Sequence, residues 1–229
     1  MSAPPQVRLH LFHAREAART VILRQGPTRL WRMILWDRDA DTFRDGQWLK
    51  HKVYAERCAI SPDGRHFLYF SLDGQWSEPT KGSYTVICQP PFFTALRLYP
   101  QGDTWGGGGY FIDATRFCIN SWGRPSALHK TEDGLEQLFF IPPTPGNPTG
   151  LADHKGNPLR LPEATRDWPM TRRAAPALDY ETEGPCLYRQ GRGSRQLIRD
   201  FSDMAFEPIP APYAPSTRAD WHPLDGGAQ

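Results

Sequence analysis

The sequence predicts an all-β protein: an antiparallel meander of blade-like, partial β-propeller-like units with an irregular, proline-rich C-terminal half. Apolar runs that alternate or are rich in β-branched residues fill the first 140 residues, and turn-forming Gly, Pro, Asp and Asn separate them. Only residues 14–19 (AREAAR) suggest a helix, and because one or two turns are marginal alone, a loop is the alternative. Of the 23 prolines, 14 lie in residues 141–229, where they remove ladder donors and fix φ.

The first expected strands follow one another closely. In residues 7–12 (VRLHLF) the valine and both leucines share one face. Residues 20–26 (TVILRQG) are rich in β-branched side chains, and residues 29–37 (RLWRMILWD) follow after a Gly-Pro-Thr turn, which predicts an antiparallel pair. Polar turns are expected at DRDADTF and RDGQW, before a further strand in residues 52–60 (KVYAERCAI).

A tight turn, SPDG at residues 61–64, leads into the rest of the meander. Its proline presets φ for an early turn position, and its glycine tolerates the positive φ that follows. The strands expected after it lie in RHFLYFSL, SYTVICQ, FFTALRLY, GYFID and RFCINSW. Gly26, Gly64 and Gly102 are spaced 38 residues apart, which suggests a repeat close to the blade length of β-propellers.

The chain is expected to form one compact domain with two parts. Residues 1–140 form the β-meander core, and residues 141–229 form a proline-rich segment that wraps it. Within that segment, residues 186–200 (CLYRQGRGSRQLIRD) predict a returning hairpin, which we expect to pair near the N-terminus and remove sheet edges. The tail after it is expected to be extended and disordered at its end. The expected anchors of the wrapping chain are Trp168 and Leu159 or Leu161.

Charge and composition argue against several classes of partner. With 27 basic and 25 acidic residues, the formal net charge is +2, which argues against nucleic acid or a membrane surface. No run approaches the ~20 apolar residues of a membrane span, and no charged and apolar leader opens the chain. None of the four cysteines forms a C-x-x-C pair, and three lie in apolar, strand-like runs. We therefore expect a soluble, reduced, cytoplasmic protein without a metal site or cofactor.

Four consecutive glycines, residues 106–109, raise the question of a phosphate site. A phosphate loop needs a following lysine and serine or threonine, and a dinucleotide turn needs a helix after its glycines. The strand-like segment YFIDATRFCIN follows instead, so we expect a wide turn or a close approach of two backbones. The alternative is a small ligand nest, formed by free glycine amides with Asp103, Thr104 and Trp105.

Other chemical motifs are weak in this sequence. The seven histidines have no metal-binding frame, and no G-x-S-x-G nucleophile turn occurs. Asp37, Asp39 and Asp41 alternate as calcium ligands do, but a plain turn is favoured because the EF-hand glycine and glutamate are missing. A solvated turn is also favoured over phosphate contact for a basic patch, without nearby acids, at Arg189, Arg192, Arg195 and Arg199.

Several strings between residues 15 and 111 are distinctive: REA, RQGP, WD, DTFRDGQWLKHKVYAERCAISPDG, QPPFFTAL and YPQGDTWGGGGYF. In these strings the chain resembles a family of bacterial proteins of unknown function. No assigned activity comes with that family, so the resemblance implies no functional residue. The SPDG turn also resembles the turn of WD40-like and TolB-like propeller blades, which implies a propeller-like meander and nothing about chemistry.

The leading hypothesis is a non-enzymatic cytoplasmic protein that binds another protein, such as an accessory or immunity-type partner. The lack of a catalytic, metal or nucleotide motif supports it, and so do Trp76 and Trp105, because tryptophans in loops are good interface anchors. The alternative is a small-ligand binder or an enzyme with a pocket formed by loops at one edge of the sheet. Such a pocket would collect His51, Arg57, Asp103 and Thr104.

Overall fold

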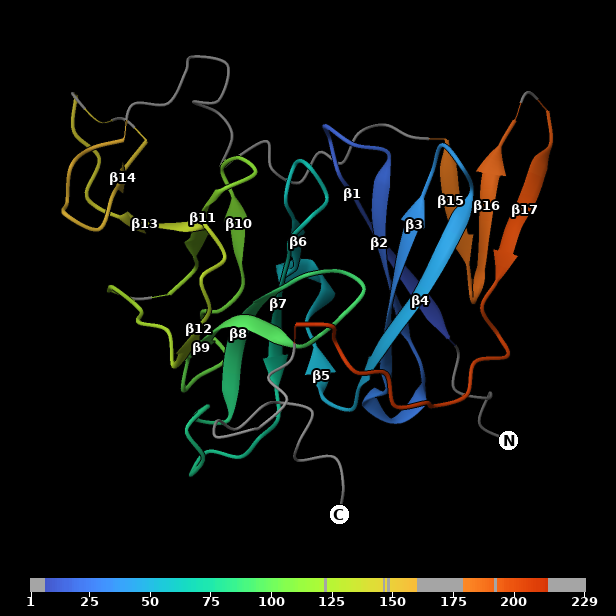
Figure 1. Ribbon diagram of the computed structural model, residues 1–229, viewed down its shortest axis with the longest axis horizontal. Helices are drawn as coiled ribbons and strands as arrows, with labels where there is room; N and C mark the ends of the chain where they lie inside the picture. The colour runs from blue at the N-terminus through green and yellow to red at the C-terminus, as the bar shows by residue number, and fades with distance from the viewer. Residues whose placement is uncertain are drawn as a thin grey trace.

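The structure is a computed structural model, and it describes residues 7–121, 123–145, 147, 149–159, 179–191 and 193–213. Within these residues the protein is all-β, as predicted: strands and two short 3-10 turns are the regular elements there. The strands form four sheets that lie side by side across the molecule (Figure 1). We call them the N-terminal, six-stranded, mixed and C-terminal sheets.

The N-terminal sheet is a four-stranded antiparallel meander in chain order. Its strands are β1 (Arg8–His13), β2 (Arg19–Gln25), β3 (Trp31–Asp37) and β4 (Thr42–Leu49). The predicted antiparallel pair is confirmed by β2 and β3, and the segment expected as a helix or loop, residues 14–19, has no helix: residues 15–18 form bends and β2 begins at Arg19. The turn expected at RDGQW is wrong, because β4 runs through it. The backbone at Pro91 packs closely against β4 at Gly46. The missing side chain allows this, because a Cβ on Gly46 would lie 1.9 Å from the carbonyl oxygen of Pro91.

The six-stranded sheet runs in the order β12-β9-β8-β7-β5, and β6 also pairs with β7. Its strands are β5 (Lys52–Val53), β6 (Ala59–Ile60), β7 (Phe67–Leu72), β8 (Ser83–Cys88), β9 (Ala95–Pro100) and β12 (His129–Lys130). The single strand expected in residues 52–60 is wrong, because the 3-10 turn Ala55–Arg57 divides it into β5 and β6. The SPDG turn is confirmed: Gly64 has a φ of 70°, and its N–H donates to the Ser61 carbonyl at 2.9 Å.

The mixed sheet contains β10 (Gly109–Phe111), β11 (Arg116–Ile119), β13 (Glu136–Phe140) and β14 (Leu151–Ala152). Strands β11 and β13 are parallel, unlike the expected meander, because the chain between them crosses to the six-stranded sheet and adds β12 there.

The C-terminal sheet contains β15 (Tyr180–Glu183), β16 (Cys186–Gln190) and β17 (Arg195–Asp200). The antiparallel β16–β17 pair confirms the hairpin predicted in residues 186–200. The hairpin does not pair with an N-terminal strand as expected. It pairs with β15, and the sheet so formed packs by its face on the N-terminal sheet.

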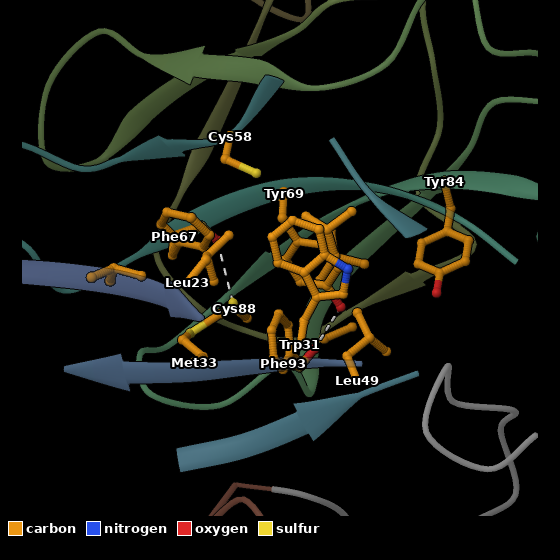
Figure 2. Packing of buried hydrophobic residues seen from close by; sticks show 14 of the residues in the cluster. Leu23, Trp31, Met33, Leu49, Cys58, Phe67, Tyr69, Tyr84, Cys88 and Phe93 are labelled. Carbon is orange, nitrogen blue, oxygen red and sulfur yellow. Dashed lines mark hydrogen bonds between the residues drawn. The ribbon is translucent and has the colours of Figure 1, made fainter. Parts of the chain in front are cut away.

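Three apolar clusters join neighbouring sheets. The largest lies between the N-terminal and six-stranded sheets, where Figure 2 shows Met33 and Phe67 among its buried side chains. A second cluster joins the six-stranded and mixed sheets, and a third joins the N-terminal and C-terminal sheets through Trp36 and Leu187. No cluster of described residues joins the mixed sheet to the C-terminal sheet. A propeller-like ring of blades therefore stays a prediction, whereas a row of packed, largely antiparallel sheets is observed.

The three repeated glycines do not occupy equivalent positions. Gly26 lies between the second and third strands of its sheet, Gly64 lies between β6 and β7, and Gly102 follows β9. The spacing of 38 residues therefore does not mark a structural repeat.

The chain after β17, residues 201–213, is an extended strap, as predicted for this part of the tail. In Figure 1 it crosses from the C-terminal sheet past the N-terminal sheet toward the six-stranded sheet. At its start, Nε of the buried Arg24 donates to the Phe201 carbonyl at 2.7 Å. At its end, the Tyr213 hydroxyl donates to the Thr94 carbonyl at 2.8 Å.

One of the expected anchors of the wrapping segment is placed by the structure. Leu159 packs on the apolar cluster of the mixed sheet. Leu161, Trp168 and the end of the tail lie outside the described residues.

Candidate functional site

The glycine run after β9 turns the chain and packs it closely, as the sequence favoured. A Cβ on Gly107 would lie 2.3 Å from the ring of Phe70, and one on Gly108 would lie 2.4 Å from the carbonyl oxygen of Arg57. Both glycines also have φ values in the left-handed region, 89° and 74°. A residue with a side chain would be strained and obstructed at either position.

Three of the four amides of this run are bonded within the chain. The N–H of Gly106 donates to Asp103 Oδ1 at 3.1 Å, and that of Gly108 donates to Thr85 Oγ1 at 2.9 Å. The N–H of Gly107 donates to the carbonyl just after β11 at 2.6 Å. A ligand nest needs free amides, and these three amides are already bonded, which disfavours the nest hypothesis.

Arg57 holds the loop around Trp105. Its guanidinium donates to the carbonyls of Thr104, at 2.8 Å, and Gly106, one on each side of the tryptophan. The same guanidinium lies over two aromatic rings, 5.1 and 5.2 Å from their centroids. Stacking and a planar fork of donors both restrict where it can move. Arg57 is therefore a structural clamp on the loop.

Asp103 fixes the same loop from its other side. Its Oδ1 accepts from the N–H of Trp105 at 2.9 Å, and its carbonyl accepts from Ser83 Oγ at 2.5 Å. The backbone of Trp105 is thereby tied to β8 and to Arg57, while its side chain is 90% exposed.

Trp76 lies on the loop that precedes β8, and its side chain is 55% exposed. Its ring packs on Gly82, where a Cβ would come within 2.4 Å of it. This loop adjoins the Trp105 loop, since a Cβ on Gly102 would lie 3.7 Å from the Lys81 side chain. We call residues 73–82 and 101–106 together the tryptophan edge.

All six residues singled out from the sequence lie around one end of the six-stranded sheet, next to the tryptophan edge. The strand register brings them together, because β5 and β8 begin and β7 and β9 end there. His51, just before β5, has its Nδ1 2.7 Å from the Tyr84 hydroxyl. Burial lowers the pKa of His51 below its ordinary value, so the neutral ring is favoured in this contact.

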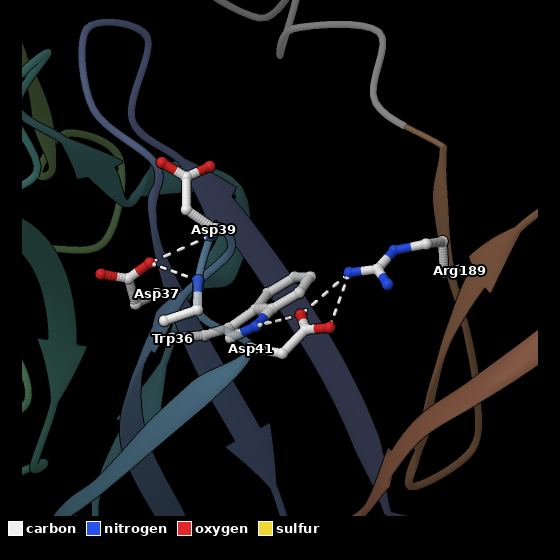
Figure 3. Close-up of polar contacts among 6 residues, drawn as sticks. Trp36, Asp37, Asp39, Asp41 and Arg189 are labelled. Atoms are coloured by element: carbon white, nitrogen blue, oxygen red, sulfur yellow. Dashed lines mark hydrogen bonds and ion pairs between the residues drawn. The ribbon is translucent and has the colours of Figure 1, made fainter.

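The aspartates before β4 form a plain turn, as favoured (Figure 3). Asp37 Oδ1 accepts from the N–H of Asp39 at 3.0 Å and of Ala40 at 3.1 Å. Both oxygens of Asp41 accept from Arg189, at 2.9 and 2.8 Å. Among the described residues, no group of three or more His, Cys, Asp or Glu side chains could hold a metal ion.

The basic patch on the C-terminal hairpin was expected to have no acids nearby, and this is wrong. Its ion pairs are Arg189–Asp41 at 2.8 Å, Arg195–Glu181 at 3.1 Å, Arg199–Asp45 at 2.7 Å and also Arg195–Glu183. The acids come from β15 and from the N-terminal sheet, so proximity in the sequence could not show them. Arg192 lies outside the described residues. Pairing leaves less free positive charge for a phosphate backbone.

A hollow of about 380 Å³ lies where the strap passes β3, β4 and β17. Its lining is Arg32, Asp45, Arg199, Asp200, Asp203, Met204, Ala205, Phe206 and Glu207. None of the six sequence-predicted residues lines it. Sequence reasoning missed this hollow because three distant segments form it, and only the packing of the C-terminal sheet and strap brings them together.

No family model, curated protein or solved structure that was compared with this chain matches it. The resemblance to a bacterial family therefore stays a prediction. In the described part of the chain, no helix has the length and apolar character of a membrane span.

Proposed function

We propose that this protein is a non-enzymatic binding protein that docks on a partner protein through the tryptophan edge. Its proposed setting is the bacterial cytoplasm, and its proposed class is an accessory or immunity-type partner. The observation that carries the proposal is Trp105, whose side chain is 90% exposed while Arg57 holds both flanking carbonyls.

An exposed indole on a rigid loop suits an interface anchor for two reasons. Tryptophan is enriched among interface residues whose truncation costs about 2 kcal/mol or more, because it buries a large ring with a polar N–H. A loop that is already ordered loses little conformational entropy on binding. Trp76 on the adjoining loop adds apolar surface to the same edge.

The test is a quantitative pull-down from a lysate of the native cells, followed by titration of the captured partner. We expect Trp105→Ala to weaken that partner by about 30-fold, the equivalent of about 2 kcal/mol. Its stability should stay within about 0.5 kcal/mol of the wild type, because the side chain is exposed. The matched control is Phe206→Ala, since Phe206 is a 63% exposed aromatic outside the edge.

A second variant tests whether binding needs the fixed loop conformation as well as the indole ring. Arg57→Met keeps Trp105 but removes the donors to its flanking carbonyls, so the partner should bind several-fold more weakly although the indole is intact. A photo-crosslinking residue at position 105 should capture the same partner, and one at position 206 should not. Unchanged binding of every specific partner by both Trp105→Ala and Trp76→Ala would falsify the proposal.

A further inference from the structure

The strap-lined hollow is a candidate ligand site with a mainly charged lining. It has a volume of about 380 Å³, and its walls come from the N-terminal sheet, the end of β17 and the strap. Five of its nine lining residues, 203–207, belong to the strap. An occupant would therefore touch both the N-terminal sheet and the strap that crosses it.

The charges of this lining favour a cation. Its four carboxylates face two guanidinium groups, and both guanidinium groups are already paired: Arg32 with Glu207, and Arg199 with Asp45 at 2.7 Å. Among the described residues, Asp200 and Asp203 form no ion pair. Within the described part of the chain, no arginine neutralises the charge of these two carboxylates, so an anionic guest would be repelled.

The apolar part of the lining also suits an organic cation. Phe206 is 63% exposed, and its ring centroid lies 6.3 Å from that of the buried Trp48. An aromatic face beside carboxylates attracts an ammonium group through the ring quadrupole as well as through charge. Met204 gives the methylene groups of a guest a further apolar contact.

We propose that this hollow binds a small organic cation, an aliphatic amine with one or two ammonium groups. The ammonium groups meet Asp200 and Asp203, and the carbon chain lies against Phe206 and Met204. Because the strap forms much of the wall, an occupant also stabilises the strap against local opening. The site is separate from the tryptophan edge, so neither proposal depends on the other.

Calorimetric titration of the full chain with 1,4-diaminobutane tests this site. The matched probes are 1,4-butanediol, which is neutral, and succinate, which is a dianion. We expect the diamine to bind at least tenfold more tightly than the diol, and its affinity to fall as salt is raised. Succinate should not bind. Equal affinity for diamine and diol, or preferential binding of succinate, would overturn the proposal.

Variants place the binding in the hollow. Asp203→Asn and Phe206→Ala should each weaken the diamine by about three- to fivefold, from the loss of one charge or one ring face. Glu78→Gln, an exposed carboxylate on the tryptophan edge, and Trp105→Ala should leave the diamine affinity unchanged. The diamine should also slow amide exchange in residues 203–207. Equal weakening by Glu78→Gln would show that the amine only screens surface charge, and the assignment would then be wrong.

Discussion

The two faces of the six-stranded sheet make very different contacts. On one face, fifteen buried residues form the apolar cluster shared with the N-terminal sheet, and Tyr69 within it donates its hydroxyl to the Phe93 carbonyl at 2.8 Å. On the other face, seven buried residues form the cluster shared with the mixed sheet. There the sheet also carries an ion pair of Arg97 and Asp133, whose side chains are only 3% and 2% exposed.

The difference follows from how the chain reaches each interface. The apolar interface joins two meanders whose strands follow one another, so alternating apolar side chains suffice to fix it. The interface between the six-stranded and mixed sheets must also fix the crossover loop after β12 in place. Arg97 on β9 holds it by donating to Asp133 and to the Leu135 carbonyl, while its guanidinium lies 5.3 Å from the centroid of the Phe117 ring. Directional polar contacts thus place a segment that lacks a long strand of its own.

Removing one partner of the buried ion pair should give the largest loss of stability. Asp133→Ala leaves the Arg97 guanidinium buried without its counter-ion, so we expect the free energy of unfolding to fall by about 4 kcal/mol. Urea unfolding measures this loss. The double variant Arg97→Met, Asp133→Leu should recover most of it, because no buried charge is left unpaired. Equal losses in the single and double variants would show that the two charges are not coupled.

A cavity in the apolar interface should come next. Leu23 is fully buried there, and Leu23→Ala should lower the free energy of unfolding by about 3 kcal/mol through lost contacts and the void left behind. The control is Leu128→Ala at a side chain that is 51% exposed, for which we expect less than about 0.5 kcal/mol. The same urea titration compares them, and similar losses would mean that burial does not set the cost.

The sequence was informative where contacts are local and periodic. Alternation and β-branching placed the β2–β3 pair, and Pro62 with Gly64 placed the SPDG turn. The same reasoning failed at Gly46, where an Asp-Gly pair reads as a turn. The structure instead uses the missing side chain to pass Pro91 closely over β4. A local pattern cannot show that a glycine serves a distant backbone.

The structure brings the six candidate residues to one end of the six-stranded sheet, but the contacts that hold them there were not predicted. Trp76 and Trp105 are exposed on adjoining loops, but Arg57 serves as a clamp for the loop rather than as a ligand-facing group. Its partners are carbonyls almost 50 residues away, and backbone acceptors carry no signature in a sequence. The ion pairs of the C-terminal hairpin escaped prediction for the same reason of sequence distance.

Acid should weaken the fold through two half-buried histidines, His13 and His66. Burial, and then the charge of Arg38, lower the pKa of His13 from 6.5 to about 4. The unfolded chain binds that proton first, so the free energy of unfolding is highest above pH 6.5 and falls as the pH drops from 6.5 to 4. Because the ring is partly exposed, we expect about 1–2 kcal/mol from it. His13→Gln should flatten the pH profile between those values, and an unchanged slope would contradict the assignment.

His66 gives the matching test at the interface between the six-stranded and mixed sheets, where its ring stacks on Phe111 with the centroids 6.4 Å apart. Burial lowers its pKa as well, so the sign of its effect is the same: stability is lost as the pH falls below 6.5. His66→Gln should flatten part of the remaining slope in a His13→Gln background. An unchanged slope in that background would mean that the interface with the mixed sheet does not contribute to acid sensitivity.

The smallest effect is expected from the Tyr69 hydroxyl, which lies inside the apolar interface. Tyr69→Phe keeps the buried ring and its edge-on contact with Phe93, but it leaves the Phe93 carbonyl without the Tyr69 donor. We expect a loss of about 1 kcal/mol, well below that of Asp133→Ala, because a neutral hydrogen bond contributes less than a buried charge pair costs when it is broken. A loss equal to that of Asp133→Ala would mean that directional contacts fix both faces of the sheet, and the contrast between them would disappear.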